Sequence, residues 1–171
     1  MKNKKMKKNP IATSCSVLGT ILLIIIIAAC VPLTVPRVMG YQIYSVVTGS
    51  MEPEIPVGSM VYVKSIAPKD LKEKDVVAFY GGRDTNAIIT HRVVSNNVIT
   101  GQLTTKGDAN ATEDMNPVSY SDVIGIVTCT IPKAGELAQI FTSSQGKIMA
   151  GSIVGLAVVL HLIASIFESK R

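Results

Sequence analysis

Two long uncharged runs, one near each end, limit what this chain can fold into. No charged residue occurs between Lys8 and Arg37, and the second run, Ile148–Phe167, has 20 residues. A helix needs about 20 apolar residues to span the hydrocarbon core of a bilayer. The sequence therefore predicts transmembrane segments at 11–36 and 147–167, on either side of a polar middle formed by residues 37–146.

The distribution of charge predicts how these segments are oriented. Five lysines lie in the first eight residues and Lys170-Arg171 close the chain, so basic residues flank the outer ends of both runs. Because cytosolic flanks are enriched in Lys and Arg, we expect 1–10 and 168–171 in the cytosol of a multi-pass cell-membrane protein, with the middle extracytoplasmic. Residues 38–146 hold 8 basic and 11 acidic side chains, a difference of −3, which disfavours nucleic acid as a partner despite the overall charge of +5.

The first hydrophobic run has two other interpretations. A lysine-rich start followed by an apolar core is also typical of a cleaved signal peptide. In addition, Ile27–Cys30 (IAAC) resembles the lipobox at which bacterial lipoproteins are cut and lipidated, although Ala-Ala-Cys is also ordinary inside a spanning helix. Whether this segment is retained or cut at Cys30 stays open, and in each case the middle of the chain is tethered at the membrane.

The middle of the chain has the pattern of short β-strands separated by turn residues. Outside the hydrophobic runs no helical periodicity is sustained, although 134–147 could form a short amphipathic turn. We therefore predict a mainly β domain, a barrel or curled sheet, whose closure removes exposed edges. The predicted strands are 41–48, 59–66, 75–80, 87–95, 97–105 and 123–131.

Ser50 lies where a predicted strand gives way to a turn-rich loop. It stands between Gly49 and Met51, and Pro53 and Pro56 follow before the chain becomes extended again. A hydroxyl held in a rigid loop suits a catalytic nucleophile. A turn serine that hydrogen-bonds its own backbone has the same pattern, so these residues alone do not assign a role.

The chain has two histidines in different settings. His91 lies in a predicted strand, where alternation puts it on the same face as Ile89 and Val93, so a buried structural histidine also fits. His161 lies in the second hydrophobic run, where a neutral imidazole is tolerated against a neighbouring helix and an aqueous substrate does not reach it.

An acidic loop follows the predicted strand 97–105. Asp108, Glu113 and Asp114 lie within it, and a carboxylate that accepts from one ring nitrogen of a histidine would leave the other nitrogen free to take a proton from serine. With one histidine available and no cysteines at ligand spacing, we expect no metal site and no cofactor. Asn110-Ala111-Thr112 also matches a glycosylation sequon, a pattern that occurs often by chance.

The three cysteines cannot form a closed set of disulfides. Cys15 and Cys30 lie in or beside the first hydrophobic run, and Cys129 lies in the predicted strand 123–131 with no histidine or charge nearby. We therefore interpret Cys129 as a small buried apolar residue and not as a nucleophile.

Taken in order, these motifs resemble a type I signal peptidase. The motifs are TGSMEP, VGSMVYVK, THRVV, TKGDANATED and VIGIVTCTIP, behind an N-terminal hydrophobic segment. They resemble the endoplasmic-reticulum type of eukaryotes, archaea and some Gram-positive bacteria, which has histidine where the other branch has lysine. The resemblance implies a membrane-bound serine endopeptidase that removes signal peptides from exported preproteins at the outer membrane–water interface.

The resemblance also implies roles for individual residues. Ser50 would be the nucleophile and His91 the general base, and an imidazole, with an unperturbed pKa of about 6.5, suits that role. Of the two aspartates in the pattern G-D-x-N-x-x-x-D, Asp114 would be the acidic partner and Asp108 would support the site. The Thr48 hydroxyl stands where relatives often carry serine and would join the Ser50 N–H in the oxyanion hole.

The implied partners are the signal peptides of preproteins and the lipid bilayer, with proximity to the translocon. An extended substrate would place alternate side chains in small pockets, which implies an Ala-x-Ala-like preference. One alternative is a non-catalytic, membrane-anchored β module that binds a partner in a secretion or surface assembly. Another is a self-cleaving repressor-type peptidase, but those enzymes use serine with lysine and have no spanning segments.

Overall fold

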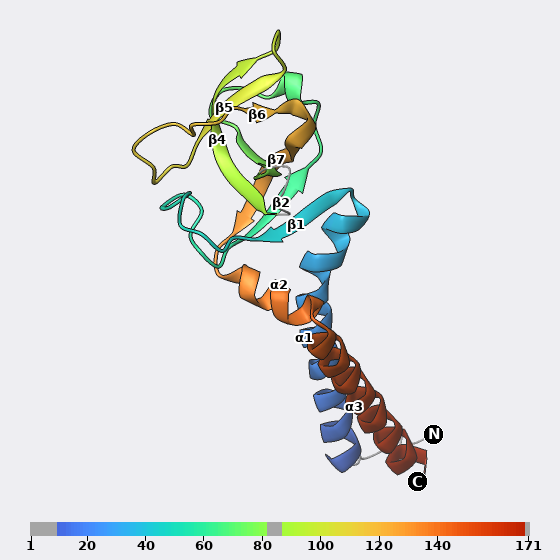
Figure 1. Cartoon of the computed structure of the whole chain (residues 1–171). Helices are drawn as coiled ribbons and strands as arrows, with labels where there is room; N and C mark the ends of the chain where they lie inside the picture. The colour runs from blue at the N-terminus through green and yellow to red at the C-terminus, as the bar shows by residue number, and fades with distance from the viewer. Residues whose placement is uncertain (1–9, 82–86, 170–171) are drawn as a thin grey trace, which may run out of the picture. The chain divides into compact units, whose positions relative to one another are not determined.

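The computed structural model describes residues 10–81 and 87–169 (Figure 1). The basic start at 1–9, residues 82–86 of a predicted turn and the last two residues of the predicted cytosolic tail lie outside these ranges. The chain divides into two compact units. One unit is Leu33–Gln139, and the other combines the residues before Leu33 with those after Gln139.

The first unit is built on a seven-stranded antiparallel sheet with the order β1-β2-β7-β3-β4-β5-β6. Figure 1 shows the sheet curling on itself, so the predicted mainly β, curled-sheet fold class is confirmed. The strands are β1 Tyr41–Ser45, β2 Met60–Lys64, β3 Val76–Tyr80, β4 Ile88–Asn97, β5 Gln102–Lys106, β6 Val118–Ser119 and β7 Val123–Ile131.

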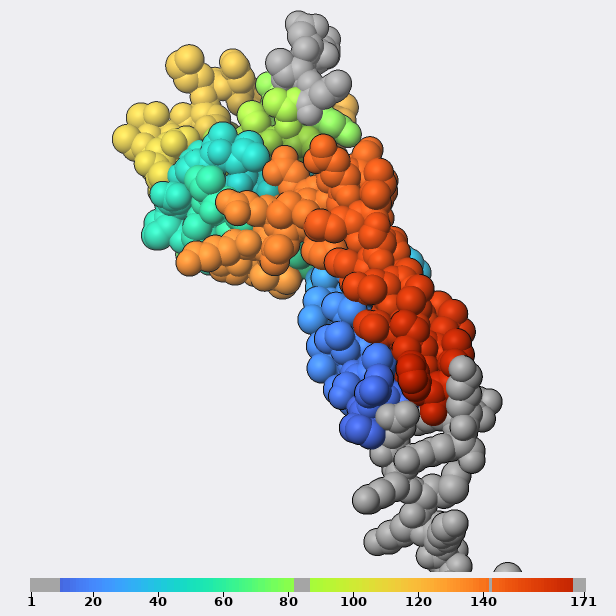
Figure 2. All heavy atoms as spheres, turned by 90° about the horizontal axis from the view of Figure 1, so that it is seen from below, coloured from blue at the N-terminus to red at the C-terminus, as the bar shows by residue number. Residues whose placement is uncertain are grey.

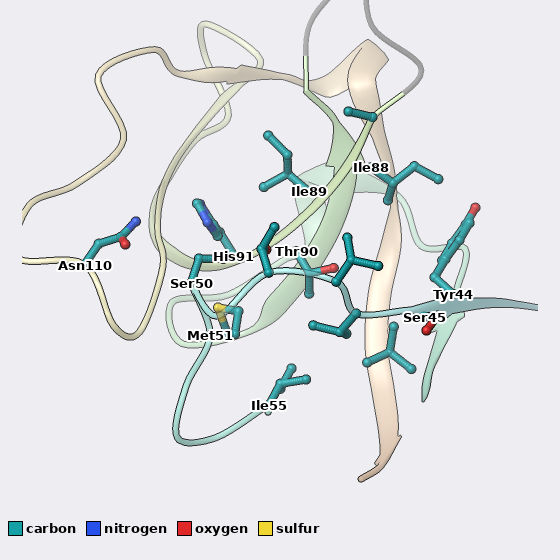
Figure 3. A pocket seen from close by; sticks show the side chains of 15 residues that line it. Tyr44, Ser45, Ser50, Met51, Ile55, Ile88, Ile89, Thr90, His91 and Asn110 are labelled. Atoms are coloured by element: carbon teal, nitrogen blue, oxygen red, sulfur yellow. The ribbon is translucent and has the colours of Figure 1, made fainter. Parts of the chain in front are cut away.

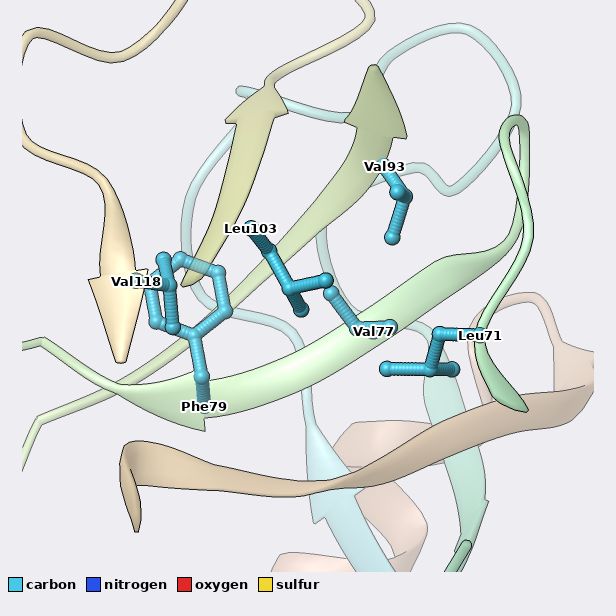
Figure 4. Packing of buried hydrophobic residues seen from close by; sticks show 6 residues of the cluster. All are labelled: Leu71, Val77, Phe79, Val93, Leu103 and Val118. Carbon is cyan, nitrogen blue, oxygen red and sulfur yellow. The ribbon is translucent and has the colours of Figure 1, made fainter. Parts of the chain in front are cut away.

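Strand β3 supplies side chains to two hydrophobic clusters, because successive residues of a strand point to opposite faces. Val77 and Phe79 belong to the cluster drawn in Figure 4, with Leu71, Val93, Leu103 and Val118. Ala78 points the other way, into a cluster with Met51, Ile55, Val61 and Val63. Burying each larger apolar side chain contributes about 1.5–3 kcal/mol, so these clusters hold the sheet in its curled form.

The predicted strand 97–105 is wrong at its beginning. Strand β4 continues to Asn97, and the next four residues form the turn of a hairpin that leads into β5. The Asn97 side-chain oxygen accepts from the N–H groups of Ile99 at 3.1 Å and Thr100 at 3.2 Å, and Gly101 adopts a φ of +66°. The turn preference of Asn97 and Gly101 therefore outweighs the preference of Val98 and Ile99 for a β-strand.

Four other elements differ from the predicted ones. Strand β1 ends at Ser45, and Val46–Thr48 continue without ladder pairing. The two-residue strand β6 is too short to leave a periodic pattern. The 3-10 helices η1 Pro68–Asp70 and η2 Tyr120–Asp122 lie in segments of turn composition.

Two long apolar helices lie near the ends of the chain, α1 Pro10–Val38 and α3 Ser144–Ser169. Both are long and apolar enough to cross a membrane and are mostly unburied, which confirms the predicted pair of apolar helices. The region expected to form only a short amphipathic turn is a nine-residue helix, α2 Ala134–Thr142. Helix α3 therefore begins before the predicted boundary at 147.

Within the helical unit α1 and α3 lie side by side (Figures 1 and 2). Most of the buried positions are small: Ala12 and Ala157 are fully buried, although Ile26 is buried too, and a Cβ on Gly19 would lie 3.0 Å from Cδ2 of His161. His161 thus packs against the neighbouring helix at Gly19. Small residues permit this close approach, while most of the larger apolar side chains of the two helices are exposed, which suits surrounding lipid.

Candidate active site

Ser50 lies in a turn that two buried side chains anchor to the core. Met51 and Ile55 are 1% and 3% exposed, and the Ile55 N–H donates to the Met51 carbonyl at 2.8 Å. Because both neighbours point into the cluster beneath the sheet, the turn is held rigidly and Ser50 stays at the surface of a cavity. The turn residues seen in the sequence therefore position a hydroxyl that lines this cavity.

A second loop is hydrogen-bonded to the Ser50 backbone. The N–H of Ala109 donates to the Ser50 carbonyl at 2.9 Å. A Cβ at Gly107 would lie 2.7 Å from the same oxygen and 2.8 Å from Nδ2 of Asn110, so only glycine permits this close approach. The Ser50 turn and the acidic loop therefore form one connected assembly.

His91 lies on β4 and is paired across the sheet with Val77 of β3. It is buried, and its Nδ1 lies 2.6 Å from Oδ2 of Asp114. The Thr105 hydroxyl donates to the same carboxylate oxygen at 2.6 Å, and the Asp114 N–H donates to the Thr105 carbonyl at 2.9 Å. Strand β5 thus holds the carboxylate in place against the imidazole.

This arrangement defines the roles of the two ring nitrogens of His91. Oδ2 of Asp114 accepts the Thr105 hydroxyl proton and faces Nδ1, so Nδ1 is the protonated donor when Asp114 is a carboxylate. In the neutral imidazole the other nitrogen, Nε2, then has a free lone pair. The Phe79 ring and the imidazole form a T-shaped pair with their centroids 6.1 Å apart, which further restricts the orientation of the imidazole.

Asp108 has a different partner. It accepts from Nε of Arg92 at 2.8 Å and from Nη2 at 2.6 Å, and Nη1 of Arg92 donates to the Lys74 carbonyl at 2.8 Å. The hydrogen bond to Asp108 and its negative charge raise the pKa of Arg92, against the opposing effect of burial. Arg92 and His91 are adjacent on β4, so their side chains point to opposite faces of the strand. Asp108 and Asp114 therefore lie on opposite faces too, each against a different residue.

Ser50 and His91 line one cavity of about 630 Å³ (Figure 3). In that view Ser50, His91 and Asn110 lie toward the left and Tyr44 lies at the right. The wall between them is largely apolar and comes from the strand-like segment after β1 and from the start of β4. The apolar lining residues include Val46, Val47, Val61, Ala87, Ile88 and Ile89.

Other predicted residues lie in or beside this cavity. Thr48 lines it two positions before Ser50, whereas Glu113 of the acidic loop is exposed. Asn110, which the sequence suggested only as part of a sequon, also lines the cavity. Thr105 was not predicted, although a threonine at a buried position of an alternating strand is a usable indication of a polar network.

The prediction that Cys129 is buried is wrong, because this residue of β7 is exposed. A bulge between β2 and β7 pairs Tyr62 with Cys129 but Val63 with Val127, which breaks the alternation of the strand at this point. Among residues 10–81 and 87–169, no three His, Cys, Asp or Glu side chains are grouped to hold a metal ion.

Tyr44 closes the end of the cavity away from Ser50. Its hydroxyl donates to Oε1 of Gln42. Burial raises the pKa of Tyr44, and the nearby Tyr80 adds to the effect. This end of the cavity is therefore uncharged at neutral pH.

Comparisons with known proteins identify the family of this chain. Residues 17–97 match the family described as "Signal peptidase, peptidase S26". The chain is 45% identical over 94 residues to "Signal peptidase I W" of Bacillus subtilis (strain 168), a match that covers 52% of this chain and 47% of that relative. It thus spans about half the length of this relative.

Two fungal proteins match over a longer stretch. Both are named "Signal peptidase complex catalytic subunit SEC11", one from Fusarium vanettenii and one from Verticillium alfalfae. Each is 32% identical over 128 residues, covering 68% of this chain and 73% of the relative. With the curled sheet and the two apolar helices, these matches show that the chain belongs to the signal peptidase family, peptidase S26.

Proposed function

We propose that this protein is a membrane-bound serine endopeptidase that removes N-terminal signal peptides from exported preproteins. The observation that carries the proposal is that Ser50 and His91 line one cavity, with Asp114 at Nδ1 of His91. Family membership and the names of the relatives, which are signal peptidases, support it.

In the proposed reaction the Ser50 hydroxyl attacks the carbonyl carbon of the scissile peptide bond. Nε2 of His91 takes the hydroxyl proton as general base and then donates it to the leaving amine, so that an acyl-enzyme forms. Water activated by the same nitrogen hydrolyses the ester and regenerates Ser50. Asp114, held by Thr105, keeps Nδ1 protonated and stabilises the imidazolium that forms in each step.

The oxyanion of the tetrahedral intermediate needs hydrogen-bond donors near Ser50. We assign this role to the Ser50 N–H and to the hydroxyl of Thr48, which lines the same cavity. Preorganised donors of this kind each contribute about a hundredfold to a thousandfold in rate. Asp108 contributes indirectly, because its ion pair with Arg92 holds the loop that bonds the Ser50 carbonyl.

The apolar wall of the cavity suits an extended peptide. Val46–Thr48 on one side and Ile88–Thr90 on the other line it next to Ser50. A substrate strand between them would direct alternate side chains toward this wall. We therefore infer a preference for small residues one and three positions before the cleaved bond.

We further propose that α1 and α3 cross the cell membrane with both chain ends in the cytosol, at 1–10 and 168–171. Residues 37–146 then form the extracytoplasmic catalytic domain between the spans 11–36 and 147–167. Ser50 follows the end of α1 after only β1 and a short connection, which suits cleavage at the outer membrane surface. Preproteins leaving the translocon would reach the site there.

The decisive experiment compares Ser50→Ala with the unchanged chain in cells that also express a panel of preproteins. We expect preproteins to lose their leaders with the unchanged chain and to keep them with Ser50→Ala. Ser95→Ala, at an exposed position of β4, is the matched control and should cleave normally. Cleavage that persists with Ser50→Ala at equal expression would favour the non-catalytic binding module instead.

A further inference from the structure

Helix α2 carries an apolar stripe that the protein leaves largely exposed. Leu137 is 58% exposed and Ile140 is 47% exposed, and Phe141 beside them is half-buried. Positions i, i+3 and i+4 lie on one face of a helix. Gln139 lies near the opposite side, so α2 is amphipathic with its apolar face outward.

A different side of α2 is fixed to the sheet unit. The Gly135 N–H donates to the Gly58 carbonyl at 2.8 Å, and a Cβ at Gly135 would lie 2.7 Å from the Ser59 carbonyl. Ala138, one turn later, is also buried. The residues that fix the first turn of α2 are therefore different from those of the apolar stripe.

The contact at Gly58 continues to the wall of the cavity. The Gly58 N–H donates to the Val46 carbonyl at 2.9 Å, and the Val46 N–H donates to the Ser59 carbonyl at 2.9 Å. Val46 lines the cavity that contains Ser50. The first turn of α2 is thus joined by backbone hydrogen bonds to one side of the cavity.

The other end of α2 leads directly into α3. One residue, Ser143, separates the two helices. Its Oγ donates to the Ile140 carbonyl at 2.7 Å and accepts from the Gly146 N–H at 3.0 Å, so it caps the start of α3. The apolar stripe therefore ends beside a helix that is long and apolar enough to cross a membrane.

We propose that α2 binds the surface of the lipid bilayer, with Leu137, Ile140 and Phe141 at the boundary between headgroups and acyl chains. An amphipathic helix that leads directly into a spanning helix lies close to the lipid headgroups. The exposed Lys133 and Lys147, on either side of α2 in the sequence, suit anionic headgroups. The inference rests on the proposed membrane crossing of α3. Through the hydrogen bond of the Gly135 N–H to the Gly58 carbonyl, the first turn of the same helix is joined to the Val46 side of the cavity.

The chain contains no tryptophan, so a single introduced tryptophan reports on one position. We would compare Leu137→Trp with Gln139→Trp in the full-length protein, reconstituted in phosphatidylcholine–phosphatidylglycerol vesicles with and without brominated phosphatidylcholine. We expect roughly twofold stronger quenching by the brominated lipid for Leu137→Trp, with emission at shorter wavelength. Gln139 is nearer than Leu137 to α3 along the chain. If quenching depended only on the distance from the spanning helix, it would therefore be stronger for Gln139→Trp than for Leu137→Trp.

Equal quenching of the two variants, or stronger quenching of Gln139→Trp, would overturn the inference. Short-wavelength emission from Leu137→Trp that brominated lipid leaves unchanged would also overturn it, since another protein surface would then cover the stripe. The readout does not require cleavage. A failure of the proposed function, seen as cleavage that persists with Ser50→Ala, would therefore be distinguishable from a failure of the lipid contact.

Discussion

Nδ1 of His91 lies 2.6 Å from Oδ2 of Asp114, although the two residues are 23 positions apart. The hairpin of β4 and β5 brings them together, because the chain returns from the acidic loop to bond the Thr105 carbonyl through the Asp114 N–H. The imidazole is thereby presented with one nitrogen bound and the other available.

Replacing Asp114 by Asn should lower kcat/KM for a preprotein by about a thousandfold or more. An amide can donate to Nδ1 and so favour the wrong tautomer, which leaves Nε2 protonated and unable to act as base. Cleavage of a purified preprotein in detergent measures the effect. Asp70→Asn, at an exposed position of η1, is the control and should retain full activity. Near-normal cleavage by Asp114→Asn would remove Asp114 from the mechanism.

Replacing Thr48 by Val should slow cleavage by about a hundredfold or more, because one donor to the oxyanion is lost while the shape of the side chain is kept. Thr48→Ser keeps the hydroxyl and should stay within about tenfold of the unchanged protein. Turnover of both variants at saturating substrate tests the assignment. Equal rates for Val and Ser at this position would contradict it.

A methyl group at Gly107 should displace the backbone that holds Ser50. The added Cβ would meet the Ser50 carbonyl at 2.7 Å, so the acidic loop or the Ser50 turn has to shift. We expect Gly107→Ala to lose most of its activity, since about 1 Å of misplacement can cost about a hundredfold in rate. Gly155→Ala in α3, where a Cβ meets nothing within 4 Å, is the matched control. Full activity of Gly107→Ala would show that the close approach is dispensable.

The ion pair of Arg92 and Asp108 should stabilise the acidic loop. Arg92→Lys keeps the charge but cannot donate two parallel hydrogen bonds to the carboxylate. Hydrogen bonds to charged groups contribute about 1.5–3 kcal/mol when well shielded, and these side chains are 31% and 18% exposed, so we expect a smaller loss of stability. Limited proteolysis should show faster cutting within 107–114, with reduced preprotein cleavage. Unchanged proteolysis would mean that the other hydrogen bonds of the loop, such as those of the Ala109 and Asp114 N–H groups, hold it without the ion pair.

Much of the architecture could be predicted from local properties of the sequence. The length and apolar character of the two terminal runs predicted α1 and α3, and β-branched residues between turn formers predicted most of the strands. The amphipathic pattern after Lys133 was recognised, but α2 proved to be a longer helix than the expected turn because Gly135 packs closely against Gly58 and Ser59. The local propensity of residues 134–142 cannot predict a contact with residues so far away in the sequence.

The sequence by itself determined the two apolar helices, the β character of the middle and the residues worth testing, Ser50 and His91, because length, periodicity and turn chemistry act over short distances. Only the tertiary structure decided that Asp114 faces His91 while Asp108 faces Arg92, and that Cys129 is exposed at a bulge. These outcomes depend on strand register and on the path of a returning loop. Both are set by contacts between residues far apart in the chain, which no local pattern encodes.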